Sequence, residues 1–450
     1  MDATALKDDA HRIQQTQQMP QLQSPIGRGS RTGVGDAATA RVVTPLAALP
    51  EAAAAGEASA ALSCEMAYVG GYLVPVVQGE FWTARQRQAA RLHEISYRAC
   101  FKPQLPAFFI ERFTAPGDLV YDPFSGRGTT AIEAALRGRQ VAANDVNPLS
   151  ALLTAPRLSP PDIDDVATRL EEIAAFKWQP RARGIDVSMF YHVDTAVEIE
   201  RLRAWLLRRD GAGETDDVDR WVRMVATNRL TGHSPGFFSV YTLPPNQAVT
   251  AERQVVINKK RAQVPTYRDT ATLILKKSRA LVSGLTEGAC ADLRKASRTA
   301  KMFTGDARRT PIIRKGSVAL TVTSPPFLDV VNYAEDNWLR CWFNGIDDRA
   351  VADLMTTPST LPIWTKVMSG VMEELYRITK IGGVVAFEVG EVRGGRVRLE
   401  EHVVPLAIAA GFILEAVMIN TQSFTKTSNI WGVTNNARGT NSNRIVVLRK

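Results

Sequence analysis

The sequence lacks the features that define several large classes of protein. Its 450 residues contain no run of about 18 consecutive apolar residues, which a membrane-spanning helix requires. The N-terminal segment has no basic stretch followed by an apolar one, so it does not resemble a secretory signal. With 45% apolar and 22% charged residues, the composition excludes collagen-like, coiled-coil and wholly disordered chains. At about 150 residues per domain, we expect a globular protein of two to three domains.

Cysteine is also scarce. The four cysteines are Cys64, Cys100, Cys290 and Cys341, and none lies in a C-x-x-C pair or has a histidine at ligand spacing. This excludes a disulfide framework and a structural zinc site, so we expect no metal. The sequence therefore predicts a reduced, cytoplasmic protein.

Four regions differ in composition and pattern. Residues 1–65 are rich in Gln, Ala, Gly, Thr and Ser without a sustained period, and we expect a disordered leader. Residues 66–157 contain a strand, a glycine loop, a helix and a second strand, which is the opening of a doubly wound α/β sheet. Residues 158–299 form a mainly helical insertion, which we expect to be the region that recognises the DNA target. Alternating strands and helices resume over 300–450, so the catalytic domain is predicted in two parts.

Three acidic residues follow successive predicted strands. Asp122 begins a loop that contains Gly126 and Gly128, Asp145 ends the second strand, and Asp306 follows the third. Glycines allow the backbone to approach a ligand closely, and an acid after the second strand commonly accepts hydrogen bonds from ribose hydroxyls. The loop has neither the third glycine of the dinucleotide fingerprint nor the lysine of a nucleoside triphosphate loop. This pattern favours an adenosine-containing ligand at the carboxyl edge of the sheet.

The tetrapeptide Ser324-Pro325-Pro326-Phe327 follows another strand, VALTV. Two consecutive prolines fix the backbone and remove two N–H donors, which leaves a stiff rim with free carbonyl groups. A serine hydroxyl beside this rim can accept or donate a hydrogen bond, and an aromatic ring offers a face on which a base can stack. The tetrapeptide therefore predicts a site for the exocyclic amino group of a nucleobase.

Together the two motifs resemble those of the amino-group DNA methyltransferases, which use S-adenosylmethionine. DPFSGRGTT resembles the family's cofactor loop and TSPPF its catalytic motif, in the S-P-P form that is typical of cytosine-N4 rather than adenine-N6 enzymes. The resemblance covers roughly residues 80–155 and 300–450. It implies a Rossmann-like methyltransferase sheet whose cofactor-binding residues are Asp122, Phe124, Gly126, Gly128, Thr129, Thr130, Asp145 and Asp306.

The resemblance also implies direct methyl transfer to a base that is extruded from double-stranded DNA. The base would stack on Phe327, while Ser324 and the carbonyl of Pro325, beside Pro326, hold its amino group. A cytosine-C5 enzyme would need a Pro-Cys nucleophile, and the sequence has none. A modification enzyme of this kind can have a separate cognate restriction endonuclease as its partner.

Other activities share parts of this pattern. Adenine-N6 methylation of DNA and guanine-N2 methylation of RNA both use a glycine loop and a related P-P-[YF] motif, although no RNA-binding module is recognisable at the N-terminus. A DNA-binding protein that holds the cofactor without turnover is a third reading. It is disfavoured because every residue of both motifs is present.

The net charge of +9 is concentrated in one segment. Residues 251–315 contain 16 basic and 5 acidic residues, a net +11, so the rest of the chain is slightly acidic. We expect this segment to form a phosphate-contacting surface beside the methyl-transfer site, although a solvated helix face has the same composition. The loop before it, Phe237–Tyr241 with Asn246 and Gln247, fits base contacts and packed core equally well.

Overall fold

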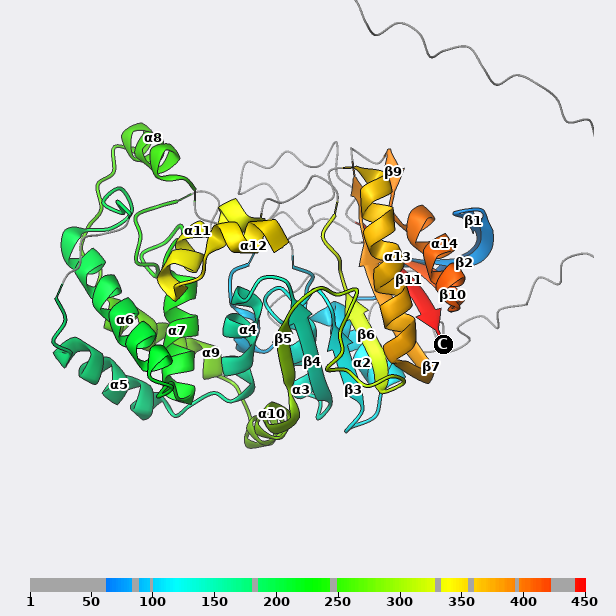
Figure 1. The fold of residues 1–450 in the computed structure, drawn as a ribbon, viewed down its shortest axis with the longest axis horizontal. Helices are drawn as coiled ribbons and strands as arrows, with labels where there is room; N and C mark the ends of the chain where they lie inside the picture. The colour runs from blue at the N-terminus through cyan, green and yellow to red at the C-terminus, as the bar shows by residue number, and fades with distance from the viewer. Residues whose placement is uncertain are drawn as a thin grey trace, which may run out of the picture. The chain divides into compact units, whose positions relative to one another are not determined.

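Nine strands form one sheet in the order β1-β2-β10-β11-β7-β6-β3-β4-β5 (Figure 1). The computed structural model describes residues 62–82, 89–97, 100–179, 185–242, 249–327, 333–354, 360–392, 396–421 and 442–450. The strands of the sheet are β1 Ser63–Val69, β2 Tyr72–Gly79, β3 Leu119–Asp122, β4 Gln140–Asp145, β5 Lys301–Thr304, β6 Val318–Thr323, β7 Thr379–Val389, β10 Ile413–Thr421 and β11 Ser442–Arg449. A separate small hairpin pairs β8 Glu391–Val392 with β9 Val397–Arg398.

The centre of the sheet is parallel. Strands β4, β3, β6 and β7 run side by side in one direction, and β5 extends this block at one edge. All six residues of β6 are buried, as expected for a parallel strand covered on both faces. Strand β11 then runs antiparallel between β7 and β10. The predicted Rossmann-like, doubly wound α/β sheet is confirmed.

Helices cover both faces of the sheet. Residues of α13 and α14 join one buried cluster, whereas residues of α2, α3 and α10 join another. Within the described part of the chain, no helix has the length and apolar character needed to cross a membrane. The α-helices are α2 Gln104–Phe113, α3 Thr129–Ala135, α4 Leu149–Thr154, α5 Ile163–Ala175, α6 Val193–Gly211, α7 Asp217–Arg229, α8 Ala251–Arg261, α9 Thr270–Val282, α10 Glu287–Thr299, α11 Tyr333–Asn344, α12 Asp348–Leu354, α13 Leu361–Ile378 and α14 Glu400–Ala410.

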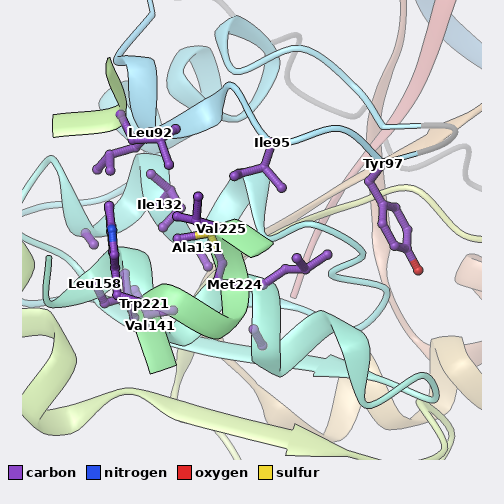
Figure 2. Packing of buried hydrophobic residues seen from close by; sticks show 14 of the residues in the cluster. Leu92, Ile95, Tyr97, Ala131, Ile132, Val141, Leu158, Trp221, Met224 and Val225 are labelled. Carbon is purple, nitrogen blue, oxygen red and sulfur yellow. The ribbon is translucent and has the colours of Figure 1, made fainter. Parts of the chain in front are cut away.

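The helical segment α5–α10 shares its core with the sheet domain. Figure 2 shows Trp221, Met224 and Val225 of α7 beside Ala131 and Ile132 of α3. The indole nitrogen of Trp221 donates a hydrogen bond to Ser278 of α9 at 2.9 Å, although its ring is fully buried. The segment is therefore packed onto the α/β domain through apolar contacts.

The aromatic loop before α8 is part of this core. Phe237, Phe238 and Val240 are buried, and the guanidinium of Arg229 lies 4.0 Å from the Phe237 ring centroid. Of the two alternatives for this loop, packed core is therefore the one that the structure supports for Phe237–Val240. Asn246 and Gln247 lie outside the described residues.

The first described strand overlaps the predicted end of the leader. Strand β1 begins at Ser63 and pairs along its whole length with β2, because Gly70 and Gly71 form a two-residue turn with φ of 58° and 87°. These positive angles favour glycine and suit a tight hairpin. The boundary expected at residue 65 cuts into this strand.

The basic segment 251–315 does not form one surface. Helix α10 ends at Thr299 and β5 begins at Lys301, which places the end of α10 at the amino edge of the sheet. Figure 1 shows α8 far from α10, near α11 and α12. The expectation of a single basic face beside the site is therefore wrong, because its helices lie at separate places in the fold.

Candidate active site at the carboxyl edge of the sheet

The glycine loop begins at a buried carboxylate. Asp122 ends β3 and is 1% exposed, and its Oδ1 accepts hydrogen bonds from Thr323 Oγ1 at 2.7 Å and from the Phe124 backbone N–H at 3.1 Å. Burial raises the pKa of Asp122 to about 7, although these hydrogen bonds oppose the shift. Asp122 therefore anchors the loop and links it to the end of β6.

Both loop glycines adopt left-handed backbone angles. Gly126 has a φ of 51° and Gly128 a φ of 76°. A β-carbon at Gly128 would lie 2.3 Å from Oγ1 of Thr154, whereas one at Gly126 would lie 3.6 Å from the ring of Tyr97 and 3.7 Å from Sγ of Cys100. The turn therefore requires glycine at 128 because of both its angle and its close approach to α4.

The acid after β4 binds the glycine loop directly. Asp145 accepts hydrogen bonds from the backbone N–H of Gly126 at 2.8 Å and of Asn147 at 2.9 Å. Burial nevertheless raises its pKa. Asp145 and the loop are therefore adjacent, as an adenosine site at this edge requires.

The third acid lies on the neighbouring strand end. Asp306 is half-exposed and accepts a hydrogen bond from Arg308 Nε at 2.9 Å, which lowers the pKa of the carboxyl group. Its loop is fixed by Asn144, whose Nδ2 donates to the carbonyls of Gly305 at 3.0 Å and Pro123 at 3.1 Å. Asn144, which the sequence pattern did not indicate, thus ties the three strand ends together.

The tetrapeptide lies on the strand next to the glycine loop. Thr323 of β6 donates to Asp122, and Thr130 Oγ1 of α3 donates to the carbonyl of Val322 at 3.0 Å. These hydrogen bonds join parts of the chain that are 201 and 192 residues apart. The fold therefore brings the two motifs that were identified in the sequence to one edge of the sheet.

Three further residues hold the tetrapeptide in place. Trp364 of α13 is fully buried, and its Nε1 donates to the carbonyl of Pro326 at 2.9 Å. A β-carbon at Gly390 would lie 3.0 Å from the Phe327 ring, so glycine leaves space for that ring. Glu388 of β7 is buried and forms a hydrogen bond with Ser324. A single acid in the otherwise apolar run VVAFEV was the only sequence signal for any of these residues.

The segment before α2 covers the glycine loop. The Arg127 guanidinium donates to the carbonyl of Ile95 at 2.9 Å, and Tyr97 and Cys100 face the α-carbon of Gly126. This segment therefore packs directly against the glycine loop.

The residues at this edge fit an adenosine-containing ligand. Among the described residues, Ser125 Oγ, Asn144 Oδ1 and Asn147 Nδ2 are buried around the loop without a hydrogen-bond partner. Buried polar groups are normally paired, so such atoms are typical of a site that a polar ligand completes. The acidic acceptors Asp145 and Asp306 complement these groups, because ribose and adenine present hydroxyl and amino donors.

The first part of this domain matches a known family. Residues 75–192, about a quarter of the chain, match the model of a family described as DNA methylase. A type II methyltransferase of Methanocaldococcus jannaschii, M.MjaII, is 34% identical over 67 residues, which are 15% of this chain and 13% of that protein. The chain thus matches only a small share of this relative. Both matches support the amino-methyltransferase family.

Solved structures resemble the chain only remotely. TrmN from Thermus thermophilus is 14% identical with a TM-score of 0.30, covering 82% of this chain and 53% of that one. Geranyl diphosphate C-methyltransferase from Streptomyces coelicolor A3(2) is 8% identical with a TM-score of 0.30, covering 77% and 76%.

Proposed function

We propose that the chain is an S-adenosylmethionine-dependent DNA methyltransferase that methylates the exocyclic N4 amino group of cytosine in double-stranded DNA. The observation that carries this proposal is the pair of hydrogen bonds, Thr323 to Asp122 and Thr130 to Val322, that hold the glycine loop beside the Ser-Pro-Pro-Phe motif. A cofactor site and a base site that share one sheet edge can align donor and acceptor. Such alignment supplies most of the rate enhancement in a direct transfer.

The residues around the glycine loop bind the cofactor. S-adenosylmethionine supplies a methyl group on a positively charged sulfur. Asp145 binds the ribose hydroxyls and Asp306 the adenine, while Gly126 and Gly128 allow the backbone to approach. Asp122, Phe124, Thr129 and Thr130 shape the loop around them. Because Asp306 is paired with Arg308, binding of adenine there includes a rearrangement of the arginine side chain.

The residues after β6 bind the target base. Ser324 and the carbonyl of Pro325 accept hydrogen bonds from the amino group, and Phe327 stacks on the ring. Nε1 of Trp364 already donates a hydrogen bond to the carbonyl of Pro326, and this contact fixes the orientation of the proline backbone. The S-P-P form of the motif favours cytosine N4 over adenine N6.

The test of the proposal uses purified protein and S-adenosylmethionine labelled in its methyl group. We expect label in double-stranded DNA that contains the recognition sequence, for which genomic DNA from a heterologous host serves as a mixture of sites. Bulk tRNA from the same host serves as the second substrate. Label in transfer RNA and none in DNA would favour the guanine-N2 alternative and contradict the proposal.

Helix α8 is the part of the basic segment that we assign to DNA phosphates. Its residues Lys259 and Lys260 are exposed. The segment before α8 is joined to α11, because Trp338 Nε1 of α11 donates a hydrogen bond to the carbonyl of Val249 at 3.2 Å. Helix α11 in turn follows the Ser-Pro-Pro-Phe motif in the chain.

Reversing the charge of Lys259 and Lys260 to Glu should therefore weaken DNA binding. Each lost phosphate contact reduces the slope of log K against log salt by about 0.9, so we expect a decrease of about 2. The matched control reverses Arg294 and Lys295, which are exposed on α10 at the amino edge of the sheet. Fluorescence anisotropy at several salt concentrations measures the DNA affinity of both variants. An equal loss in the two variants would show that α8 has no special role.

A further inference from the structure

Strand β7 carries a buried carboxylate next to the Ser-Pro-Pro-Phe motif. Glu388 is 7% exposed and lies between the buried residues Phe387 and Val389. In the parallel pairing of β6 and β7, Thr323 is opposite Phe387, so the next residues along the two strands, Ser324 and Glu388, are neighbours. A buried acid is costly unless it is hydrogen-bonded, so its partners indicate why it is there.

The partners of Glu388 come from two different elements. Asn443 of β11 donates a hydrogen bond from its Nδ2 to Glu388 Oε1, and the side chain of Ser324 forms the second hydrogen bond. Burial raises the pKa of Glu388 to about 6, whereas both hydrogen bonds lower it. The carboxyl group is thus mostly ionised at neutral pH, yet it accepts a proton more readily than an exposed glutamate does.

An ionised Glu388 fixes the direction of the Ser324 hydroxyl. A serine hydroxyl has one proton to donate and two lone pairs that accept, whereas an ionised carboxylate only accepts. The proton of Ser324 therefore points at Glu388, and its lone pairs remain for another donor. The exocyclic amino group of a base is such a donor.

We propose that Glu388 is a positioning residue that orients Ser324 as an acceptor and takes up, through it, the proton that the target amino group loses. This inference rests on the proposed function. As the bond between nitrogen and the methyl carbon forms and the carbon–sulfur bond breaks, one N–H proton of the amino group moves to Ser324 Oγ. The original hydroxyl proton moves to Glu388, which becomes a neutral carboxylic acid and later releases that proton to solvent.

Nearby charges do not account for the ionisation of Glu388. Burial and the hydrogen bonds from Asn443 and Ser324 are the causes of its shifted pKa. Strand β6 carries no charged residue. The other elements packed against β7 carry Glu111 and Arg112 on α2, Lys366, Glu373, Glu374 and Arg377 on α13, and Arg444 and Arg449 on β11.

The first test compares Glu388→Gln with Ser324→Ala and the double variant. General-base assistance is worth about 100-fold or more, so kcat should fall by about that factor in Glu388→Gln while KM changes little. If the two residues act as one unit, the double variant should be no slower than Ser324→Ala alone. The control is Glu415→Gln, a buried glutamate on β10 that pairs with Arg449. Unchanged kcat in Glu388→Gln, or additive losses in the double variant, would overturn the inference.

The second test follows the pH dependence of kcat. The wild type should lose activity as the pH falls through about 6, because a Glu388 that is already protonated cannot take up the proton from the amino group. Asn443→Ala removes a hydrogen bond that lowers the pKa of Glu388, so this acidic limb should move to higher pH. If Glu388 had a purely structural role, the acidic limb of the pH profile of kcat would stay at the same pH in both the Asn443→Ala and the Glu388→Gln variants.

The third measurement needs no turnover. A carboxyl group whose pKa is raised in the folded state binds extra protons there, so folding stability falls as the pH rises from about 4.5 to about 6. Thermal unfolding at several pH values should show this decline in the wild type but not in Glu388→Gln. If the stability of both proteins changed with pH in the same way, the assignment would be contradicted. If the wild type methylates no nucleic acid, the proposed function fails, whereas an active wild type with a fully active Glu388→Gln variant overturns only this inference.

Discussion

Replacing Ser324 with alanine should reduce methyl transfer by at least about 100-fold and leave cofactor binding intact. The hydroxyl is the group that orients the target amino nitrogen, and loss of one positioned hydrogen-bonding group in an active site costs about this much. The cofactor residues lie at the ends of β3, β4 and β5 and at the start of α3, so we expect them to be unaffected by the missing oxygen atom. Isothermal titration with S-adenosylmethionine and a single-turnover methylation assay separate the two effects.

A serine outside the site provides the control for this variant. Ser369 lies on α13 and makes only a long, exposed contact of 3.5 Å with Glu373. Ser369→Ala should methylate at the wild-type rate. Full activity of Ser324→Ala would contradict the assigned role of the tetrapeptide, and a loss of cofactor binding in that variant would place the serine in the wrong site.

Replacing Gly128 with alanine should have the largest effect on the cofactor site. The new β-carbon would lie 2.3 Å from Oγ1 and 2.4 Å from Cγ2 of Thr154, a residue that is fully buried in α4. Overpacking of this kind costs ~1–3 kcal/mol. The left-handed backbone angle adds about 1–2 kcal/mol for a residue with a β-carbon. We expect a lower melting temperature and an affinity for S-adenosylmethionine that falls at least about tenfold, which calorimetry measures.

Two further variants separate the clash from the backbone strain. Gly316 has a φ of 65° and open space around its α-carbon, so Gly316→Ala carries the strain alone. Adding Thr154→Ala to Gly128→Ala removes two of the three contacting atoms and should restore part of the affinity. A Gly128→Ala variant that binds the cofactor as tightly as Gly316→Ala does would contradict the loop geometry described above.

The sequence predicted the parts of the site that depend on local order along the chain. A strand, a glycine loop and a second strand are contiguous, and neighbouring parallel strands end at the same edge, so the proximity of Asp145 to Gly126 followed from the pattern. The position of Ser324 after a mostly apolar strand was also readable, because strands of this kind occupy the centre of a parallel sheet. Both motifs lie where these arguments placed them.

The residues that support the site could not be predicted in the same way. Trp364 of α13 donates a hydrogen bond to the tetrapeptide and Asn443 of β11 donates one to Glu388, and no local pattern relates either residue to the motif. Such contacts depend on how distant elements pack. For the same reason the basic segment 251–315 looked like one surface in the sequence, although α8 and α10 lie apart in the fold.

The sequence also did not show that the insertion shares its core with the sheet domain. The sequence separated residues 158–299 from the sheet because their pattern changes from alternating strands and helices to helices alone. Val225 nevertheless lies beside Ile132, which follows the glycine loop, and Trp221 belongs to the same buried cluster (Figure 2). Apolar helix faces carry no information about which partner covers them, so only the structure reveals that this segment supports the cofactor side of the site.

The identity of the methylated base tests the central claim most directly. DNA from cells that express the chain, and from cells that express Ser324→Ala, is digested to nucleosides and analysed by mass spectrometry. We predict N4-methylcytosine in the first sample and none above background in the second. N6-methyladenine without N4-methylcytosine would contradict the assignment of cytosine as the target. The absence of both bases from DNA incubated in vitro with the purified protein and S-adenosylmethionine would contradict the proposed activity.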